Sequence, residues 1–307
     1  MKAHSDTGPH QVQSTCDVCG SNTVRELYTA SDRLCNNGPL WTIVECIGCG
    51  VLRTLPELSD AELGRYYPDE YWGAPEPTQK WINSSQSEKT DFLAGCGLHG
   101  GKILDVGCGS GFFLRALNAE KWDRYGVEPS ELAAKEAERF VGAGHVVVGT
   151  LTKTELPDSI FDVITMWSAL EHANGPRAYL RAAKRLMKPG GTLVIQVPNA
   201  ASYQARFFRG DWFALDAPRH RYHFNFSLLD KLLSESGFEV YRATYFSKAH
   251  NSHALRQSLK TRLLRDERSL HSGLFYVSIP FIKPFDAMMS ALGKGATLTV
   301  AARSLDR

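Results

Sequence analysis

Four of the seven cysteines stand in two C-x-x-C pairs near the start of the chain: Cys16, Cys19, Cys46 and Cys49. In a cytosolic protein such pairs are typical of metal ligands rather than disulfides. Four thiolates suit zinc in a closed, tetrahedral site. Gly20 and Gly50 follow the two pairs, where a tight turn needs a residue that tolerates a positive φ. The spacing therefore predicts a structural zinc ion, and free thiols or a redox pair are the alternative.

A second group of residues could bind a nucleoside cofactor. Residues 105–111 read D-V-G-C-G-S-G and follow a short apolar run. The third glycine comes one position too early for the G-x-G-x-x-G of dinucleotide folds. Asp105 beside this turn disfavours a pyrophosphate and favours an ammonium or sulfonium group. Glu128 closes the next apolar run, where a carboxylate can accept hydrogen bonds from both hydroxyls of a ribose. The pattern predicts an adenosine-type cofactor.

Three histidines are candidates for a general base. His172 follows Glu171 at the end of another apolar run, and a structural role in ordering the loop is the alternative. His220 and His223 belong to the run D-A-P-R-H-R-Y-H-F, which also holds two arginines. Such a group could bind an anionic acceptor and remove a proton. A solvated loop with stacked aromatic residues is the alternative for this run.

Alternating strands and helices would position these residues. Helical patterns, including residues 112–121 and 176–188, separate five apolar runs. The runs are residues 102–106, 124–127, 145–148, 161–167 and 192–197. This alternation predicts a doubly wound α/β fold with a mostly parallel sheet and helices on both faces. In such a sheet ligands bind at the carboxyl ends of the strands, where Asp105, Glu128 and His172 stand.

The chain is expected to divide near residue 75. Residues 1–75 would form the cysteine module and a short helix, and residues 76–307 the α/β domain. Within the second part, residues 200–226 would form a substrate lid over the carboxyl edge of the sheet, because binding residues concentrate on such loops. Residues 247–293 would form a helical insertion.

Composition bounds the class of protein. The chain has 307 residues, 43% hydrophobic and 22% charged, with a net charge of +2. These are ordinary values for a globular protein, and they exclude a disordered or collagen-like chain. A net charge near zero does not indicate nucleic-acid binding.

Targeting signals are not apparent in the sequence. The first fifteen residues lack the apolar segment of a secretory signal, and no apolar run reaches the length of a membrane span. We therefore expect a cytoplasmic protein. Residues 273–292 predict an amphipathic helix pair, with weak contact to a lipid surface or a lipid-linked substrate as the alternative.

The motifs together resemble those of class I S-adenosylmethionine-dependent methyltransferases. L-D-V-G-C-G-S-G is similar to their first motif and Y-G-V-E-P-S to their second. Residues 156–172 resemble the segment running into their fourth strand, and residues 186–199 the helix, turn and fifth strand that follow. The cysteine module resembles the N-terminal zinc-binding segment of a bacterial subgroup that includes some sugar C-methyltransferases.

The resemblance implies a Rossmann-like sheet of seven strands, with the last strand antiparallel, preceded by a small zinc-binding β module. We place the last two strands at residues 238–245 and 296–302. The implied cofactor is S-adenosylmethionine. Gly107, Gly109 and Gly111 would let the backbone approach its methionine part. Asp105 would orient that part, and Glu128 would bind the ribose hydroxyls.

The resemblance also implies roles for residues after the third and fourth strands. Thr150 and Leu151 stand where the family contacts adenine, with Thr150 in place of the usual acid. Trp167 and Ser168 would lie beside the methyl group of the cofactor. Some related O-methyltransferases bind a metal through an E-x-x-E-H motif at this strand end. Here Ser168 replaces the first acid, so the motif lacks one ligand.

The expected function is methyl transfer from S-adenosylmethionine to a small-molecule acceptor, such as a nucleotide- or lipid-linked sugar. A quinone-type or other small-molecule O-methyltransferase is one alternative. A non-catalytic module that binds the cofactor or docks a partner is another. The intact glycine turn, together with Asp105 and Glu128, argues against the non-catalytic module.

Overall fold

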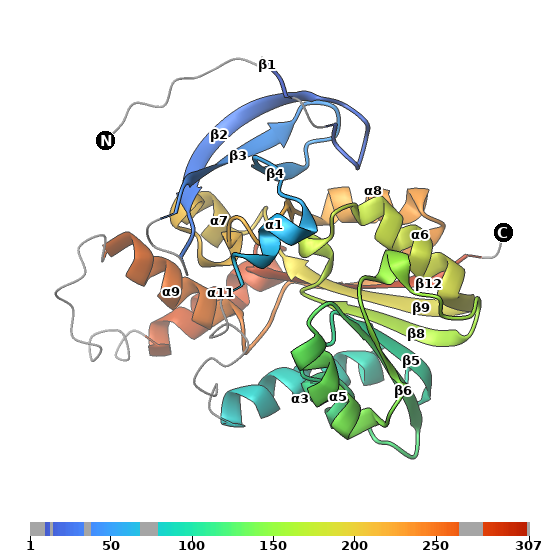
Figure 1. Cartoon of the computed structure of the whole chain (residues 1–307). Coiled ribbons are helices and arrows are strands. Elements are labelled where there is room, and N and C mark those ends of the chain that lie inside the picture. The colour runs from blue at the N-terminus through green and yellow to red at the C-terminus, as the bar shows by residue number, and fades with distance from the viewer. Residues whose placement is uncertain (1–9, 13–14, 34–37, 68–78, 264–278, 306–307) are drawn as a thin grey trace.

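The computed structural model describes residues 10–12, 15–33, 38–67, 79–263 and 279–305. These residues form two sheets: the smaller lies at the top of Figure 1, and the larger lies below it with helices packed on both of its faces. None of the helices in this part of the chain is both long and apolar enough to cross a membrane.

The larger sheet has seven strands in the order β11-β12-β9-β8-β5-β6-β7. Only β12 runs antiparallel to its neighbours, between β11 and β9. The strands are β5 (Gly101–Val106), β6 (Trp122–Glu128), β7 (Val146–Val148), β8 (Phe161–Trp167), β9 (Met187–Pro198), β11 (Phe238–Thr244) and β12 (Thr297–Ser304). The predicted α/β fold class, with a mostly parallel sheet of seven strands, is confirmed.

Helices cover both faces of this sheet (Figure 1): α3 and α5 lie on one face, and α6 and α8 on the other. Successive strand residues point to opposite faces. On β5, Ile103 belongs to the core under α3, α4 and α5, whereas Leu104 belongs to the core under α6 and α8. The helices are α1 (Asp60–Gly64), α3 (Gln79–Gly95), α4 (Phe112–Ala116), α5 (Glu131–Val141), α6 (Pro176–Leu186), α7 (Tyr203–Phe208), α8 (Phe226–Glu235), α9 (Asn251–Leu263) and α11 (Ile279–Ala291).

Two predicted helices are shorter than expected. α4 stops at Ala116 instead of continuing to residue 121, because the chain turns there and the Asn118 side chain accepts a hydrogen bond from the Glu120 N–H. α6 ends at Leu186, because β9 already begins at Met187. This strand includes residues 189–191 (P-G-G), which were expected to form a turn before it.

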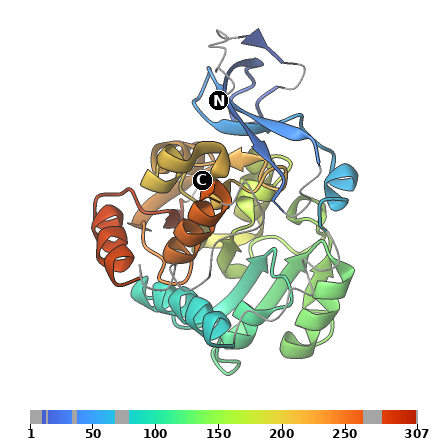
Figure 2. The same ribbon diagram turned by 90° about the vertical axis from the view of Figure 1, so that its left-hand side faces the viewer.

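The smaller sheet joins the cysteine module to the lid. Its order is β1-β2-β3-β4-β10, and all its pairings are antiparallel. Its strands are β1 (His10–Gln11), β2 (Thr23–Ser31), β3 (Leu40–Cys46), β4 (Leu52–Leu55) and β10 (Tyr222–His223). The first four strands come from the N-terminal segment, whereas β10 comes from the predicted lid. Figure 2 shows this sheet seated on the α/β domain.

The lid is folded rather than irregular. Between β9 and α8 it contains α7, two 3₁₀ turns and β10. The 3₁₀ turns of the whole described chain are η1 (Leu151–Lys153), η2 (Leu170–His172), η3 (Arg209–Asp211) and η4 (Phe213–Leu215). The lid packs between the two sheets. The division of the chain that was predicted near residue 75 stays a prediction.

Candidate active site and metal site

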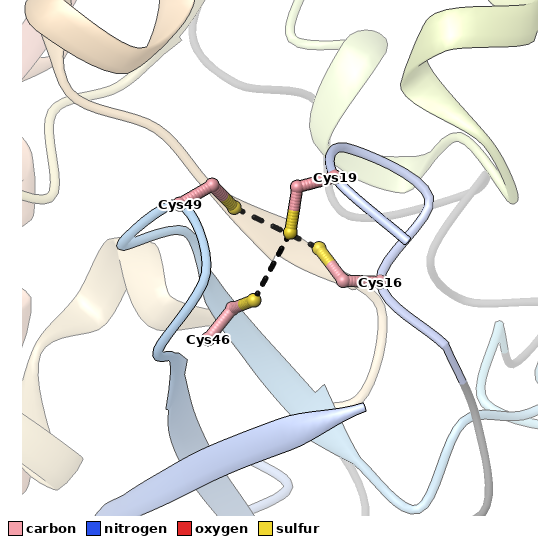
Figure 3. A group of neighbouring side chains, drawn as sticks. All are labelled: Cys16, Cys19, Cys46 and Cys49. Atoms are coloured by element: carbon pink, nitrogen blue, oxygen red, sulfur yellow. Dashed lines mark hydrogen bonds between the residues drawn. The ribbon is translucent and has the colours of Figure 1, made fainter. Parts of the chain in front are cut away.

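The four cysteines of the two C-x-x-C pairs lie together (Figure 3). Their sulfur atoms are all within 4.8 Å of one another, with 3.8 Å between Cys16 and Cys49 and 3.5 Å between Cys19 and Cys46. A tetrahedral site with Zn–S bonds of about 2.3 Å has sulfur–sulfur separations of about 3.8 Å. The hydrogen bond between Cys49 and Cys16 lowers the pKa of Cys16 to about 5 and raises that of Cys49, and burial raises the pKa of Cys19. Among these three cysteines, without a bound metal, only Cys16 therefore favours the thiolate that a metal binds. The geometry fits a four-thiolate zinc site.

Glycines allow the two cysteine pairs to approach each other. Gly20 and Gly50 both have a φ of +78°, and the N–H of each donates to the carbonyl of the first cysteine in its pair. At Gly48, a Cβ would lie 2.9 Å from the Sγ of Cys19. A larger residue at this position would therefore push the two pairs apart.

The glycine turn joins β5 to α4 at the carboxyl edge of the larger sheet. Gly107, Gly109 and Gly111 all have positive φ values, between +53° and +77°. A Cβ on Gly109 would meet no atom within 4 Å, so this glycine borders open space. A Cβ on Gly111 would lie 2.8 Å from the Cα of Ala137, so this glycine lets α4 pack against α5. The backbone near Gly109 is thus accessible to a ligand.

Asp105 is buried at the end of β5 and accepts a 2.7 Å hydrogen bond from the Thr165 hydroxyl. Burial raises the pKa of Asp105 to about 7, and the nearby ammonium of Lys89 opposes this rise. Burial also lowers the pKa of Lys89, whose ammonium lies 5.5 Å from the ring centre of Trp167 and 5.7 Å from that of Phe113. Lys89 was not predicted from the sequence, because α3 lies outside the glycine motif.

Glu128 closes β6 and is 3% exposed. The N–H groups of Gly109 and Ser130 donate to its two oxygens, each over 2.9 Å. Burial raises the pKa of Glu128, and these two hydrogen bonds oppose the rise. The carboxyl group is therefore held between the glycine turn and the start of α5. Each of its oxygens retains a further lone pair that can accept a hydrogen bond from a ligand.

The remaining predicted cofactor contacts differ in accessibility. Leu151 is fully buried in the core, and its carbonyl oxygen accepts hydrogen bonds from the N–H and the hydroxyl of Thr154. Thr150 is half-buried in front of η1. Trp167 is 7% exposed at the end of β8, and Ser168 follows it, exposed and with a φ of +55°. The contact of these residues with a cofactor stays a prediction.

Glu171, His172 and His220 form a cluster beside the end of β8, with one potential ligand atom from each within 4.8 Å of the others. The two imidazole rings meet edge to face, with their centroids 4.6 Å apart. Both Glu171 oxygens are buried without a hydrogen-bond partner. Burial raises the pKa of Glu171 to about 8, so its carboxyl group is protonated at neutral pH. The three side chains could also hold a metal ion, with His220 as the ligand that the motif lacks at Ser168.

Backbone carbonyls fix the protons of two histidines. Nδ1 of His172 lies 3.0 Å from the Arg219 carbonyl oxygen and 2.9 Å from the Tyr67 hydroxyl oxygen. Nδ1 of His220 lies 2.9 Å from the Ala214 carbonyl oxygen. A carbonyl only accepts, so each Nδ1 carries the proton and each Nε2 carries the lone pair. Burial lowers the pKa of His172 to about 4 and that of His220 well below its usual value. Both rings are therefore neutral at neutral pH and able to accept a proton.

His223 joins the same region from β10. Its ring centroid is 6.4 Å from that of His220, and burial lowers its pKa to about 4. Its Nε2 lies 3.1 Å from the hydroxyl oxygen of Thr54 on β4. The structure thus brings together the three histidines named from the sequence, and adds Glu171 and Thr54. The sequence showed Glu171 only as the second acid of an incomplete E-x-x-E-H motif, and Thr54 was missed because it lies in the other sheet.

The two arginines of the run D-A-P-R-H-R-Y-H-F are bonded to acids. Arg219 is fully buried and donates to both Asp32 and Asp216, with distances from 2.8 to 3.2 Å. Arg221 donates to Asp60 over 2.7 Å. Their charges are compensated within the protein, so the expectation that they bind an anionic acceptor finds no support in the geometry.

The sequence profile of a family described as methyltransferase domain matches residues 79–243, which is more than half of the chain. The chain belongs to this methyltransferase family. The predicted family and its fold are thereby confirmed.

Curated proteins and a solved structure resemble part of this chain. Two proteins named ubiquinone biosynthesis O-methyltransferase, from Alkalilimnicola ehrlichii and Methylococcus capsulatus, are each 32% identical to it, over 135 and 134 residues. Each match covers 42% of this chain and 55% or 56% of the relative, so the chain spans about half the length of these curated relatives. A solved methyltransferase from Thermotoga maritima shares the fold with a TM-score of 0.50 and 20% identity, over 80% of this chain and 95% of that one.

Proposed function

We propose that this methyltransferase-family chain transfers a methyl group from S-adenosylmethionine to a small-molecule acceptor that loses a proton in the reaction. One observation carries the proposal: the buried, neutral histidines and Glu171 lie at the same edge of the sheet as the glycine turn. A cofactor site and a proton acceptor side by side are what such a reaction requires.

The cofactor would lie along the carboxyl ends of β5 and β6. When bound, it supplies a methyl group on a positively charged sulfur, which a nucleophile displaces in line. The accessible backbone at Gly109 suits its methionine part, and Asp105 would orient the ammonium. Glu128 would accept hydrogen bonds from the ribose hydroxyls. The hydroxyl of the half-buried Thr150 would contact adenine, and the fully buried Leu151 would support that side of the pocket from the core.

The proton would pass to a histidine of the lid. Nε2 of His220, where the proton would be accepted, lies 3.9 Å from an oxygen of Glu171 and 3.9 Å from an oxygen of Asp216. Burial alone would raise the pKa of Asp216, but hydrogen bonds from Arg219 hold it below its usual range, so this acid is ionised and stabilises the imidazolium. His223 is the second candidate base of the lid. His172, next to Ser168 at the end of β8, is the alternative and would also affect cofactor binding.

We further propose that Cys16, Cys19, Cys46 and Cys49 hold a zinc ion with a structural role. Support comes from their sulfur–sulfur separations and from Gly48, which lets the two pairs approach. Four thiolates leave no coordination position for a substrate, so this zinc would not take part in the chemistry.

Two acceptor classes are open to the same site. The resemblance of the cysteine module to sugar C-methyltransferases favours a nucleotide- or lipid-linked sugar. The names of the curated relatives favour an O-methylation in quinone biosynthesis. Either acceptor could have a lipid part. The exposed Phe285, Met288 and Leu292 in and just after α11 support the weak membrane-surface contact predicted for residues 273–292, although 273–278 lie outside the described residues.

The test is a screen of acceptor classes with radiolabelled S-adenosylmethionine, comparing the wild type with His220→Ala and His223→Ala. We expect label on one acceptor class, and a loss of about 10²- to 10⁴-fold in single-turnover rate when the base is removed. Transfer at the wild-type rate by both variants would remove the lid histidines from the mechanism and leave His172 as the candidate.

A further inference from the structure

Thr54 connects the cysteine module to the candidate base. It lies on β4, it is 3% exposed, and its N–H donates to the carbonyl of Arg221. Its hydroxyl oxygen lies 2.7 Å from the carbonyl oxygen of His220 and 3.1 Å from Nε2 of His223. One residue of the N-terminal sheet thus contacts three neighbouring residues of the lid.

The hydroxyl of Thr54 has one proton, and this limits the hydrogen bonds it can make. The carbonyl oxygen of His220 can only accept, so at 2.7 Å the hydroxyl must donate its proton there. The same hydroxyl can then only accept from His223. Nε2 of His223 therefore carries the proton of that ring, and Nδ1 carries the lone pair.

We propose that Thr54 is a positioning residue for methyl transfer, which fixes His223 as the Nε2–H tautomer and presents Nδ1 as the proton acceptor. This inference rests on the proposed function. It assigns the cysteine module a part in the active site, instead of the docking role considered from the sequence.

The register of the smaller sheet shows how the cysteines support this contact. β3 ends at Cys46, and β4 pairs with β3 so that Thr54 lies opposite Ile43 and Leu52 opposite Glu45. On its other side β4 pairs with β10, with Leu52 opposite His223. β4, which carries Thr54, therefore lies between β3, which ends at Cys46, and β10, which belongs to the lid. A change at the cysteines would move the Thr54 hydroxyl relative to His223.

The test measures the tautomer of His223 directly, by the side-chain nitrogen chemical shifts of ¹⁵N-labelled full-length protein, with the His223→Gln variant used for assignment. We expect the Nε2–H form in the wild type and in Thr54→Ser, and a mixture of tautomers in Thr54→Val, which keeps the shape but lacks the hydroxyl. Thr42→Val, on the neighbouring strand β3, is the matched control and should leave His223 unchanged. An Nδ1–H form in the wild type, or an unchanged spectrum in Thr54→Val, would overturn the proposal.

Catalysis gives a second readout. With an acceptor that the screen identifies, Thr54→Val should lower kcat by about 10- to 100-fold at unchanged cofactor affinity, and Thr54→Ser should restore most of it. Equal losses in both variants would mean that Thr54 has only a packing role, which would overturn the positioning role. Because the tautomer is measured without an acceptor, a failed acceptor screen would count against the proposed function and not against the role of Thr54.

Discussion

At the carboxyl edge of the larger sheet, burial sets the protonation of the candidate bases. His172 and His223 have pKa values lowered to about 4 because the ring loses contact with water. A base must be unprotonated to act, so its activity is lost only as the pH falls through its pKa in the folded protein. We expect kcat to be nearly constant from pH 7 to pH 5.5 and to fall towards pH 4. A pH profile at saturating cofactor tests this, and a half-maximal rate near pH 6.5 would contradict it.

Glu171 should make the folded protein less stable as the pH rises, whereas the candidate bases lose activity as the pH falls. Its pKa is raised to about 8 in the folded chain, so between about pH 4.5 and pH 8 the folded state holds a proton that the unfolded state has lost. The free energy of unfolding should therefore fall as the pH rises through this window, by up to about 1.4 kcal/mol per pH unit.

Glu171→Gln removes this dependence, because glutamine is neutral at every pH. Its melting temperature relative to the wild type should be higher at pH 8 than at pH 5, as measured by thermal unfolding. Glu120→Gln, at an exposed position, is the control and should show no such trend. If the melting temperatures of the wild type and of Glu171→Gln changed in parallel with pH, the Glu171 carboxyl group would be ionised in the folded protein, contrary to this prediction.

The cofactor pocket can be tested at Glu128 and Gly109. Glu128→Ala should weaken S-adenosylmethionine binding by about 1–3 kcal/mol, the scale of a charge-assisted hydrogen bond in a buried site. Gly109→Val should abolish binding by filling the space beside the turn. Gly144→Val is the matched control, because Gly144 also has a positive φ and open space around its Cβ position. Unchanged cofactor affinity in both pocket variants, by equilibrium dialysis, would place the pocket elsewhere.

At the scale of the elements, the sequence predicted those whose pattern is local. β8 has the bounds expected from its apolar run, and α5 begins after Ser130, whose side chain caps it, as serine commonly does. The glycine turn, with Asp105 before it and Glu128 on the next strand, also follows from local spacing. The pairing of β10 with β4 could not be predicted, because it joins a two-residue strand to a segment far away in the sequence. For the same reason the ion pair of Arg219 with Asp32 was missed.

The smaller sheet should lose order when its cysteines are changed. Cys46→Ser removes one sulfur at the end of β3, which we expect to release the metal and to weaken β4 and its partner β10. Hydrogen exchange should then accelerate at the amides of β4 and β10 but not at β5. Metal analysis of the purified wild type should find one zinc per chain. Well under one zinc, or no change in exchange at β10, would contradict a structural zinc that supports the lid.

At the scale of the whole molecule, the candidate active site draws residues from the larger sheet and from the lid that meets the smaller one. The larger sheet carries the candidate cofactor residues Asp105 and Glu128, and the lid that meets the smaller sheet carries His220 and His223. Arg219 and Asp32 form a fully buried ion pair between the lid and the end of β2. Since removal of one partner from a buried pair leaves an uncompensated charge, Arg219→Met should destabilise the protein by about 3–5 kcal/mol. Denaturant unfolding measures this, and a loss below about 1 kcal/mol would mean that lid and module are not firmly joined.

The central proposal is that this chain binds S-adenosylmethionine at the carboxyl edge of the larger sheet and uses it as a methyl donor. The most direct measurement is calorimetric titration of the full-length protein with S-adenosylmethionine. We predict a single site per chain with a dissociation constant at or below about 100 µM, which corresponds to roughly −5.5 kcal/mol or tighter. No binding at millimolar cofactor would contradict the proposed function.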